Sequence, residues 1–571
     1  MAVARTPLFR LLQKLDRRHR ARDAASSSEA SVGAAAGPVR IDRRSFLWAA
    51  GAVVAAPTLG AACGGSENPP PSSGKRVAVV GGGIAGLHCA YRLKDLGADD
   101  VVLFEAQDRI GGRMFSDRTT FAPLNCELGA ELIDTGHETM RDLAAEFGIE
   151  LHDFTTDDAE LELIVAFLGG RRVPVDELLT AYAPIAARID ADLATIGGDG
   201  YVTYDAPNGG ELLDALSITG WFDRLVDEGV IAADNVARQL FELAYTTEYG
   251  LEPSEQSALN VLFLVSTSTT DLAPYGDSDE RFRAAAGNDT FITALGDRLG
   301  DVVRKGHRLT ALRRGTDGRF TLSFTTASGG VEETADEVVL ALPFTMLREV
   351  ALDDSLALSS AKRAAIDTIG YGTNAKLMVG FNEPVWRNKQ AGNTSNGEVY
   401  SDTGFQSMWE TSRLQTASTE GIATNFTGGA HGVEIGDGTP AEQATAFVGE
   451  LNGIFPGVAA AFNDKVARFH WPTNAFVKAS YACYRPGQYA AICGAEGEPE
   501  ASGHLHFCGE HTSLDFQGYM EGGAVTGAAA ALAAAENVGV DTQALRVDGP
   551  AARILARADV VRRHRRLRRR R

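Results

Sequence analysis

The chain has 571 residues, of which 44% are hydrophobic and 23% are charged, a balance that excludes a wholly disordered or fibrous protein. Its formal net charge of −21 is uneven: residues 1–44 carry +6 and residues 548–571 carry +8, so residues 45–547 carry −35. Such an acidic body repels phosphate, which excludes nucleic acid as the main partner, and the longest candidate apolar stretch, 14 residues at Phe46–Leu59, excludes a polytopic membrane protein.

The N-terminal region has the features of an export signal. Arg43-Arg44-Ser45-Phe46-Leu47 precedes an apolar run that ends at Leu59. Basic residues, a short apolar stretch and small residues in this order are typical of twin-arginine signals; chance arginines before a buried core helix are the alternative. We therefore expect the chain to meet the twin-arginine export machinery and to reside in the periplasm or another extracytoplasmic compartment.

Cys63 ends the sequence Leu59-Gly60-Ala61-Ala62-Cys63, which is similar to a lipoprotein processing site except at Gly60. A membrane tether through Cys63 is one expectation, and ordinary cleavage nearby is the other. Residues 64–74, rich in Pro, Gly and Ser, have the composition of a linker. The cysteines form no CxxC pair, so we expect no metal site. Cys483 and Cys493 are close enough in sequence to pair, with buried thiols as the alternative.

Residues 76–105 carry the first motif with chemical content. Arg76–Val80 is a short apolar run that predicts a buried parallel strand, and Gly81-Gly82-Gly83-Ile84-Ala85-Gly86 follows at once. A helical pattern then runs from Leu87 to Leu96, and Val101–Phe104 predicts a second strand that ends in Glu105. Strand, glycine turn, helix, strand and acid in this order predict a dinucleotide-binding unit.

The residues of the turn each have a physical role in such a unit. Gly81 permits the tight turn, Gly83 lets the backbone approach a pyrophosphate, and Gly86 lets helix and strand pack closely. The N–H groups at the start of the helix, around Ala85, attract the phosphates. Glu105, 19 residues after Gly86, can accept hydrogen bonds from both hydroxyls of an adenosine ribose.

The second half of the signal, residues 105–113, indicates which dinucleotide binds. Gly111-Gly112 permits another close backbone approach, and Arg113 can offset phosphate charge; Arg109 belongs to the same segment. Together with the glycine turn, this pattern resembles the flavoprotein amine oxidase family. The resemblance implies that the dinucleotide is FAD.

The resemblance extends over residues 75–540, with the motifs in the family's order. Leu128–Leu132 is similar to the segment that passes close to the flavin, which implies cofactor contacts for Gly129, Ala130 and Glu131. The run that begins at Leu309 resembles the strand whose backbone meets the adenine.

The C-terminal block carries the most specific part of the likeness. Residues 507–512 and 518–522 resemble the segments that close the flavin site, which implies cofactor contacts for Gly509, Glu510 and Met520. Glu510 would accept from the ribityl chain. The Ala-rich stretch 522–536 is expected to be a helix whose N-terminus points at the flavin and stabilises negative charge there.

The resemblance implies an α/β fold: a Rossmann-like FAD-binding domain of the glutathione-reductase type, with a substrate domain of mixed sheet and helix inserted in pieces. We expect the FAD-binding domain at residues 75–130, 285–350 and 480–540, and the substrate domain at 131–284 and 351–479. Residues 1–74 would be signal and linker, and 541–571 a basic tail. Arg562–Arg571 holds eight arginines in ten residues, for which solvated disorder is the expectation and attraction to anionic lipid the alternative.

Three residues match the family's catalytic equipment. Lys376, in an apolar strand, matches the lysine that holds a water at flavin N5; a snorkelling lysine on an edge strand is the alternative. Tyr481 and Tyr519 match the paired aromatic walls before the flavin, with core aromatics as the alternative. Trp471 and Trp409 are candidates to line the substrate pocket. Because Ser480 replaces the cysteine that some members bond to the flavin, we expect non-covalent FAD.

The implied reaction is oxidation of an amine to an imine by hydride transfer to flavin N5. Oxygen would be the acceptor, giving peroxide, and hydrolysis would give aldehyde and ammonia. Amino-acid oxidases grip the substrate carboxylate with an arginine, but the matching position here is Leu132, within Glu131-Leu132-Ile133-Asp134, so a plain amine is the leading expectation. L-Amino-acid oxidation remains open because an arginine could come from another segment. A desaturase or porphyrinogen-oxidase-like enzyme is a further alternative, since the fold alone does not separate these activities.

Overall fold

The computed structural model describes residues 74–157, 161–198, 200–389, 392–542 and 549–568. The predicted export signal and the Cys63 tether therefore lie outside the described residues. Within them, the dinucleotide-binding unit forms as the sequence predicts: strand β1 (Arg76–Val80), helix α2 (Ile84–Asp95) and strand β2 (Asp100–Phe104) follow one another, and β1 pairs with β2 in parallel. Both strands are buried along almost their whole length because both faces of the sheet are covered: Val77 and Val79 pack against helices such as α2, and Ala78 and Val80 pack against the apolar side chains of a second sheet.

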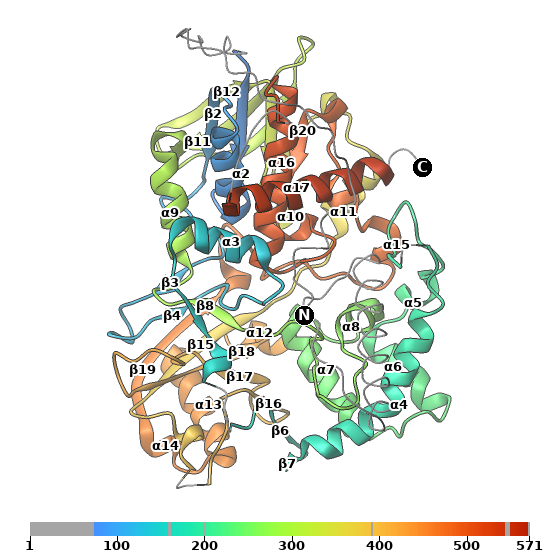
Figure 1. The fold of residues 1–571 in the computed structure, drawn as a ribbon, viewed down its shortest axis with the longest axis vertical. Helices are drawn as coiled ribbons and strands as arrows, with labels where there is room; N and C mark the ends of the chain where they lie inside the picture. Colours follow the sequence, from blue (N-terminus) through green and yellow to red (C-terminus); the bar gives the residue numbers. More distant parts are fainter. Residues whose placement is uncertain (1–73, 158–160, 199, 390–391, 543–548, 569–571) are drawn as a thin grey trace, which may run out of the picture. The chain divides into compact units, whose positions relative to one another are not determined.

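The strands of this parallel sheet come from three separate stretches of the chain. Its order is β20-β13-β1-β2-β9, with β9 at Val303–Arg304, β13 at Glu337–Leu340 and β20 at Leu505–Phe507. Helix α16 (Met520–Asn537) packs against α2, as Figure 1 shows. The two helices meet so closely that a Cβ on Gly527 would lie 2.2 Å from the backbone oxygen of Ala85. The exact limits of the predicted discontinuous domains stay a prediction.

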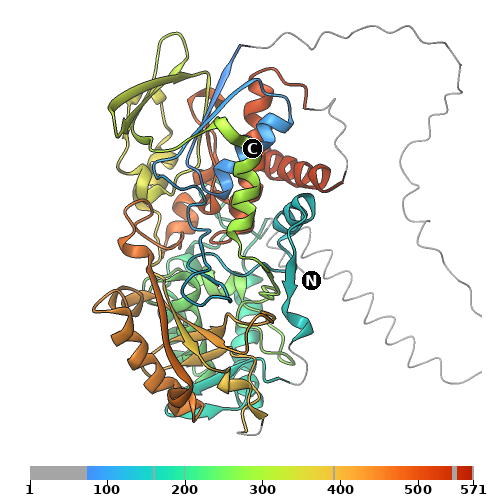
Figure 2. The same cartoon turned by 90° about the vertical axis from the view of Figure 1, so that its left-hand side faces the viewer.

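A second sheet, antiparallel except for the parallel pairing of its edge strand β14 with β10, lies beside the parallel one. Its order is β12-β11-β10-β14, with β10 at Arg308–Arg314, β11 at Phe320–Thr326, β12 at Gly329–Ala335 and β14 at Ala351–Leu352. The turn between β10 and β11 contains Thr316-Asp317-Gly318. Figure 2 shows these strands in yellow-green next to the blue strands of the parallel sheet.

The third sheet has seven strands in the order β19-β15-β18-β17-β16-β6-β7. Their bounds are β6 Val165–Leu168, β7 Arg171–Val173, β15 Ala375–Phe381, β16 Val399–Ser401, β17 Ser407–Glu410, β18 Gly421–Thr427 and β19 Phe462–His470. Helix α13 (Pro440–Ile454) covers one face, where it shares a hydrophobic cluster with Leu377 and Val399. Helix α7 (Val236–Tyr249) covers the other face, because Tyr400, one residue after Val399, packs in the cluster of that helix.

Two short ladders and the remaining helices complete the described chain. The ladders pair β3 (Ser116–Asp117) with β4 (Cys126–Glu127) and β5 (Leu151–Asp153) with β8 (Phe282–Ala284). The other α-helices are α3 Glu138–Phe147, α4 Val175–Leu193, α5 Glu211–Asp214, α6 Ile218–Asp227, α8 Ala258–Leu264, α9 Asp289–Leu299, α10 Phe344–Leu347, α11 Ser360–Thr368, α12 Gly429–Glu434, α14 Val458–Ala461, α15 Gln488–Ile492 and α17 Gly549–Arg568. In the described part of the chain, none of the helices has the length and apolarity that a membrane span requires.

The basic tail differs from the expectation. The predicted disorder from Arg562 is wrong as far as Arg568, because α17 continues to that residue. The helix packs against α3 and α16: Ile554 and Ala558 are buried, and Arg553 and Arg557 both pair with Asp142 of α3 (Figure 1). The apolar contacts and ion pairs of the first half of α17 therefore hold this helix against the protein, although its basic composition alone would favour a solvated segment.

Candidate cofactor and substrate site

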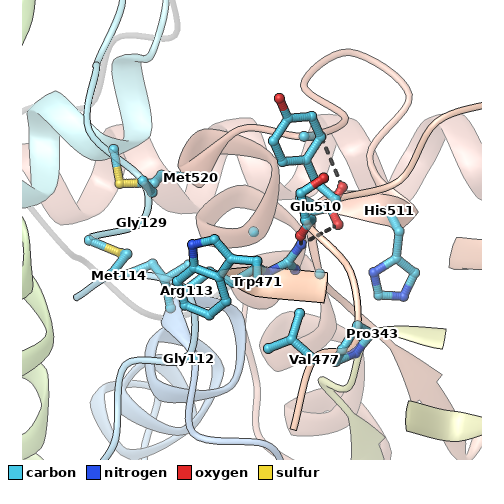
Figure 3. A pocket seen from close by; sticks show the side chains of 18 of the residues that line it. Gly112, Arg113, Met114, Gly129, Pro343, Trp471, Val477, Glu510, His511 and Met520 are labelled. Carbon is cyan, nitrogen blue, oxygen red and sulfur yellow. Dashed lines mark hydrogen bonds and ion pairs between the residues drawn. The ribbon is translucent and has the colours of Figure 1, made fainter. Parts of the chain in front are cut away.

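One large pocket connects the glycine turn after β1 with the seven-stranded sheet. Its lining runs from Gly81–Gly83 past Lys376 to Tyr481 and Tyr519, so the pocket is elongated and reaches both parts of the fold. Figure 3 shows part of its wall, where Arg113, Trp471 and Glu510 lie close together although they come from distant parts of the sequence. The predicted dinucleotide-binding residues and the predicted catalytic residues therefore line one continuous pocket.

The glycine turn has the geometry of a phosphate cradle. Gly81 has a φ of +112°, and a Cβ there would lie 2.6 Å from the Ala341 oxygen. A Cβ on Gly83 would meet nothing within 4 Å, so this backbone faces open space at the start of α2. Gly86 does not line the pocket; its Cβ would lie 1.9 Å from the Gly81 oxygen, which fits its predicted packing role. Free N–H groups at this helix end can receive phosphate oxygens.

Glu105 stands at the edge of the pocket, at the end of β2. One of its oxygens accepts from the Gly82 N–H at 2.7 Å and the other from the Gln107 N–H at 2.8 Å. Burial raises the pKa of this carboxyl. Two backbone donors therefore hold Glu105 in place, and each oxygen keeps a further lone pair for a ribose hydroxyl.

The predicted arginines divide into two roles. Arg113 lines the pocket and donates to Glu510 at 2.9 Å and to the Ser480 oxygen at 2.7 Å, so it ties three distant segments together. The other Glu510 oxygen accepts from the Gly518 N–H at 2.9 Å. Arg109 does not line the pocket: it donates to the Gly112 oxygen at 2.7 Å, where it shapes the loop that the cofactor would meet.

His511 is a pocket residue that sequence reasoning missed. It is 1% exposed, and neither ring nitrogen has a hydrogen-bond partner in the part of the chain that the structure describes. Burial, and then Arg113, hold the pKa of this imidazole well below its ordinary value. A neutral imidazole with an unmet donor and an unmet acceptor is costly in a buried site, and a polar cofactor in the pocket would satisfy it. Together with the cradle at Gly83, this orphaned ring fits FAD.

Lys376 lies on β15, an interior strand between β19 and β18, so the edge-strand alternative is wrong. Its neighbours Ala375 and Leu377 face α13, so alternation turns Lys376 to the pocket side. Its Nζ donates to Glu131 at 2.7 Å and lies 4.9 Å from the centre of the Trp409 ring. Although burial alone would raise the pKa of Glu131, Lys376 and then Arg283 hold it below its usual range.

Tyr481 and Tyr519 both line the pocket, and their hydroxyls converge on one residue. The Tyr481 hydroxyl donates to the backbone oxygen of Glu248 at 2.6 Å, and the Tyr519 hydroxyl donates to its carboxylate at 2.8 Å. Trp471 donates from Nε1 to the Leu128 oxygen at 3.0 Å, in the segment predicted to pass the flavin. The predicted aromatic walls are therefore held by hydrogen bonds at their rims.

The structure brings nearly all predicted site residues to this one pocket. The lining includes Gly81, Gly83, Ala85, Glu105, Gly112, Arg113, Gly129, Ala130, Glu131, Leu309, Lys376, Trp409, Trp471, Tyr481, Gly509, Glu510, Tyr519 and Met520. Only Gly86 and Arg109 of the predicted set lie outside it. Among all the described residues, those of the pocket included, no group of three or more His, Cys, Asp or Glu side chains is arranged to hold a metal ion, and Cys483 and Cys493 are buried thiols.

Three glutamates in the pocket wall were also missed by sequence reasoning. Glu248, Glu280 and Glu398 all line the pocket, and the Tyr400 hydroxyl donates to Glu398 at 3.0 Å. Burial, then Glu398 and Glu248, raise the pKa of Glu280 well above its ordinary value, so the three carboxyls lie within electrostatic reach of one another. In an acidic chain, three single glutamates at unrelated positions give no sequence signal.

Comparison with known proteins places the chain among flavoenzymes. The family model described as flavin containing amine oxidoreductase matches residues 84–535. Polyamine oxidase 7 of Oryza sativa subsp. japonica is 24% identical over 79% of this chain and 93% of its own length. L-Amino-acid oxidase 4 of Hebeloma cylindrosporum is 24% identical over 77% of this chain and 79% of its own. Cyclohexylamine oxidase from Brevibacterium oxydans IH-35A has a similar fold, with a TM-score of 0.68 at 21% identity over 81% of this chain and 99% of its own.

Proposed function

Because the chain belongs to the family of flavin-containing amine oxidoreductases, we propose that this FAD-dependent enzyme oxidises a primary amine that carries a second cationic group, with oxygen as electron acceptor. The observation that carries the proposal is the acidic wall formed by Glu248, Glu280 and Glu398. Within this wall, Glu248 accepts from the Tyr481 hydroxyl through its backbone oxygen and from the Tyr519 hydroxyl through its carboxylate. An ammonium group of the substrate would bind there.

The electrostatics of this wall favour a cation. Carboxyls that raise one another's pKa repel each other when ionised, and a bound ammonium removes that repulsion. No arginine or lysine of the described chain pairs with Glu280, and its pKa is raised well above normal. A diamine would therefore place one ammonium between the glutamates while the other nitrogen stays near Lys376. That one relative is named a polyamine oxidase supports the same substrate class.

The chain's own residues would do the following work. The glycine turn and Arg113 would hold the diphosphate of FAD, and Glu105 would hold its ribose. When bound, FAD would supply the two-electron acceptor for the carbon next to the reacting nitrogen. Tyr481, Tyr519 and Trp409 would exclude water from that nitrogen, and desolvation favours its neutral form, which has the lone pair that oxidation requires. Lys376 would hold a water beside the reacting atoms.

An amino-acid substrate fits this wall less well. A substrate carboxylate next to the reacting nitrogen needs a positively charged partner. Leu132 lines the pocket at the position that matches the carboxylate-binding arginine of amino-acid oxidases. The arginines that line the pocket are Arg113, already paired with Glu510, and Arg308, paired with Glu349. The three glutamates of the pocket wall would in addition repel a carboxylate.

A peroxide-coupled assay with matched substrates tests the proposal. We expect 1,4-diaminobutane to give a KM at least about tenfold lower than butylamine, which corresponds to ~1.4 kcal/mol, because only the diamine reaches the acidic wall. Glu280→Gln should raise the KM for the diamine and leave that for butylamine unchanged, whereas Glu332→Gln, on the exposed face of β12, should alter neither. Equal KM values for both amines would contradict the proposal that the substrate carries a second cationic group. Peroxide formation from L-amino acids alone would instead establish L-amino-acid oxidation.

We further propose export by the twin-arginine route, with Cys63 as a lipid attachment point. The support is the order of Arg43-Arg44, the apolar run to Leu59 and the small residues before Cys63. A protein that must fold around a dinucleotide before it crosses a membrane suits this route.

A further inference from the structure

A group of buried charges lies behind the pocket wall, beneath Lys376. Lys376 and Glu131 line the pocket, whereas Arg283 of β8 and Glu127 of β4 do not and are completely buried. These four residues come from three short strands and one loop that the fold brings together. Of the four, Arg283 and Glu127 have no part in the predicted site, and sequence reasoning gave neither of them a role.

Glu131 bridges the two cations through its two oxygens. Its Oε2 accepts from Lys376 Nζ at 2.7 Å. Its Oε1 lies 3.5 Å from Arg283 Nη1 and accepts from the Thr411 hydroxyl at 3.0 Å. Arg283 Nη1 also donates to the Thr411 backbone oxygen at 2.7 Å, so Arg283 and Thr411 together hold the far side of the carboxylate.

Arg283 is an unfavourable residue for stability alone. Its side chain is 0% exposed, and its Nε and Nη2 have no hydrogen-bond partner among the residues that the structure describes. A buried guanidinium with incomplete hydrogen bonding costs free energy that an apolar side chain of similar volume would avoid. Its position is more easily explained by what its charge does to the carboxylates next to it.

That charge acts on both neighbouring acids. Burial raises the pKa of Glu127 to about 7, and Arg283 opposes this rise. Burial would also raise the pKa of Glu131, but Lys376 and then Arg283 lower it below its ordinary value. Glu131 therefore stays a carboxylate that can bind the lysine, and without Arg283 it would lose one of the two cations that lower its pKa.

We propose that Arg283 is a positioning residue for the active-site lysine: by fixing Glu131 from behind the wall, it fixes Lys376 Nζ at its place in the pocket. This inference rests on the proposed amine oxidation. If the inference holds, Arg283 acts on the reaction only through Lys376. This dependence can be tested, because substitutions of residues that act as one unit have non-additive effects on the activation free energy, whereas substitutions at independent sites have additive ones.

A double-mutant cycle tests that dependence. Arg283→Met, Lys376→Met and the double variant are loaded with FAD, and the rate of flavin reduction by 1,4-diaminobutane is measured without oxygen. We expect Arg283→Met to slow reduction by roughly 10- to 100-fold, as a small misplacement of a catalytic group does, with little change in FAD affinity. The double variant should be no slower than Lys376→Met alone.

Arg92 supplies the matched control. It is the other arginine among the largest fully buried side chains, but it lies in α2, where it donates to His88 at 3.0 Å and pairs with Glu146, away from the pocket wall. Arg92→Met should lower the midpoint of thermal unfolding, and any effect on reduction should multiply with that of Lys376→Met. The proposal would be overturned if the rate losses of Arg283→Met and Lys376→Met multiplied in the double variant. It would also be overturned if the flavin of Arg283→Met were reduced at the parent rate.

Two further measurements keep the outcome decisive. If Arg283→Met does not fold, the same cycle is run with Arg283→Lys, which keeps the positive charge at a shorter reach and should show the same dependence on Lys376. In Glu131→Gln, which removes the bridging charge, Arg283→Lys should cause no further loss of rate. A parent enzyme that no amine reduces would refute the proposed function itself, whereas a reducible parent with a multiplicative cycle would refute only the positioning role.

Discussion

At the scale of single residues, burial decides which predictions the sequence could support. Lys376 could be predicted because a lysine in an apolar strand is conspicuous, and its match to a family motif indicates its role. Glu280, Glu398 and Arg283 could not, because their importance comes from the neighbours that the fold supplies. His511 stood inside a recognised motif, yet only its unpaired ring nitrogens mark it as a pocket residue.

Glu496 allows a stability prediction that is independent of catalysis. Burial raises the pKa of this carboxyl to about 7 from an ordinary value of 4.5, and it accepts from the Tyr484 hydroxyl at 3.1 Å. Between these two pH values the unfolded chain has released a proton that the folded chain still holds. Raising the pH from 4.5 through 7 therefore favours unfolding, by up to ~3 kcal/mol, and the cost is complete above pH 7.

Glu496→Gln should remove this penalty because an amide does not ionise. We expect the midpoint of thermal unfolding to be higher for the variant than for the parent at pH 8, and the difference to be smaller or absent at pH 5. Scanning calorimetry would measure both midpoints. A difference between the two proteins that is the same at both pH values would mean that Glu496 does not titrate in this range.

At the scale of elements, the glycine turn and the helix α16 show how local sequence becomes a binding site. The turn could be predicted in detail because each glycine answers a local steric demand. The packing of α16 on α2 could not, since an Ala-rich stretch gives no directional hydrophobic pattern; only the structure shows Gly527 against Ala85. The same reason explains why α17 was missed: its basic composition conceals the two buried positions Ile554 and Ala558.

Gly527→Ala tests the close contact between these helices. Its Cβ would lie 2.2 Å from the Ala85 oxygen, so α16 must move away from α2. We expect a loss of about 1–3 kcal/mol in stability and weaker FAD binding, because α2 begins at the phosphate cradle and α16 at Tyr519. Chemical denaturation and FAD titration would measure the two effects.

Gly449→Ala in α13 is the matched control. A Cβ at this helical position meets nothing within 4 Å, so the variant should gain about 0.5–1 kcal/mol through its higher helix propensity. If both alanines had the same effect on stability, the contact between α16 and α2 would not be the cause.

At the scale of the whole molecule, three stretches of chain that are far apart in sequence build one sheet, and the pocket joins it to another. The order of motifs made this architecture predictable, because each segment predicted to contact FAD was recognised by its own residues. The inserted helices α4–α8 carry no such motif, so the residues they contribute to the pocket, Glu248 above all, depended on the three-dimensional structure.

The export proposal also concerns the whole molecule. In Arg43→Lys with Arg44→Lys, we expect the protein to fold and bind FAD but to accumulate in the cytoplasm, which cell fractionation would reveal. The Cys63→Ser variant should still be exported and should move from the membrane to the soluble fraction. Normal export of the double-lysine variant would contradict the twin-arginine route.

The most direct test of the account is absorbance spectroscopy of the purified protein mixed with 1,4-diaminobutane in the absence of oxygen. We predict that the protein carries the visible absorption bands of non-covalent FAD, that the diamine bleaches them, and that Lys376→Met retains the bands but bleaches far more slowly. A protein that shows no flavin absorption even after reconstitution with excess FAD would contradict the assignment of the pocket, and with it the roles given to its residues.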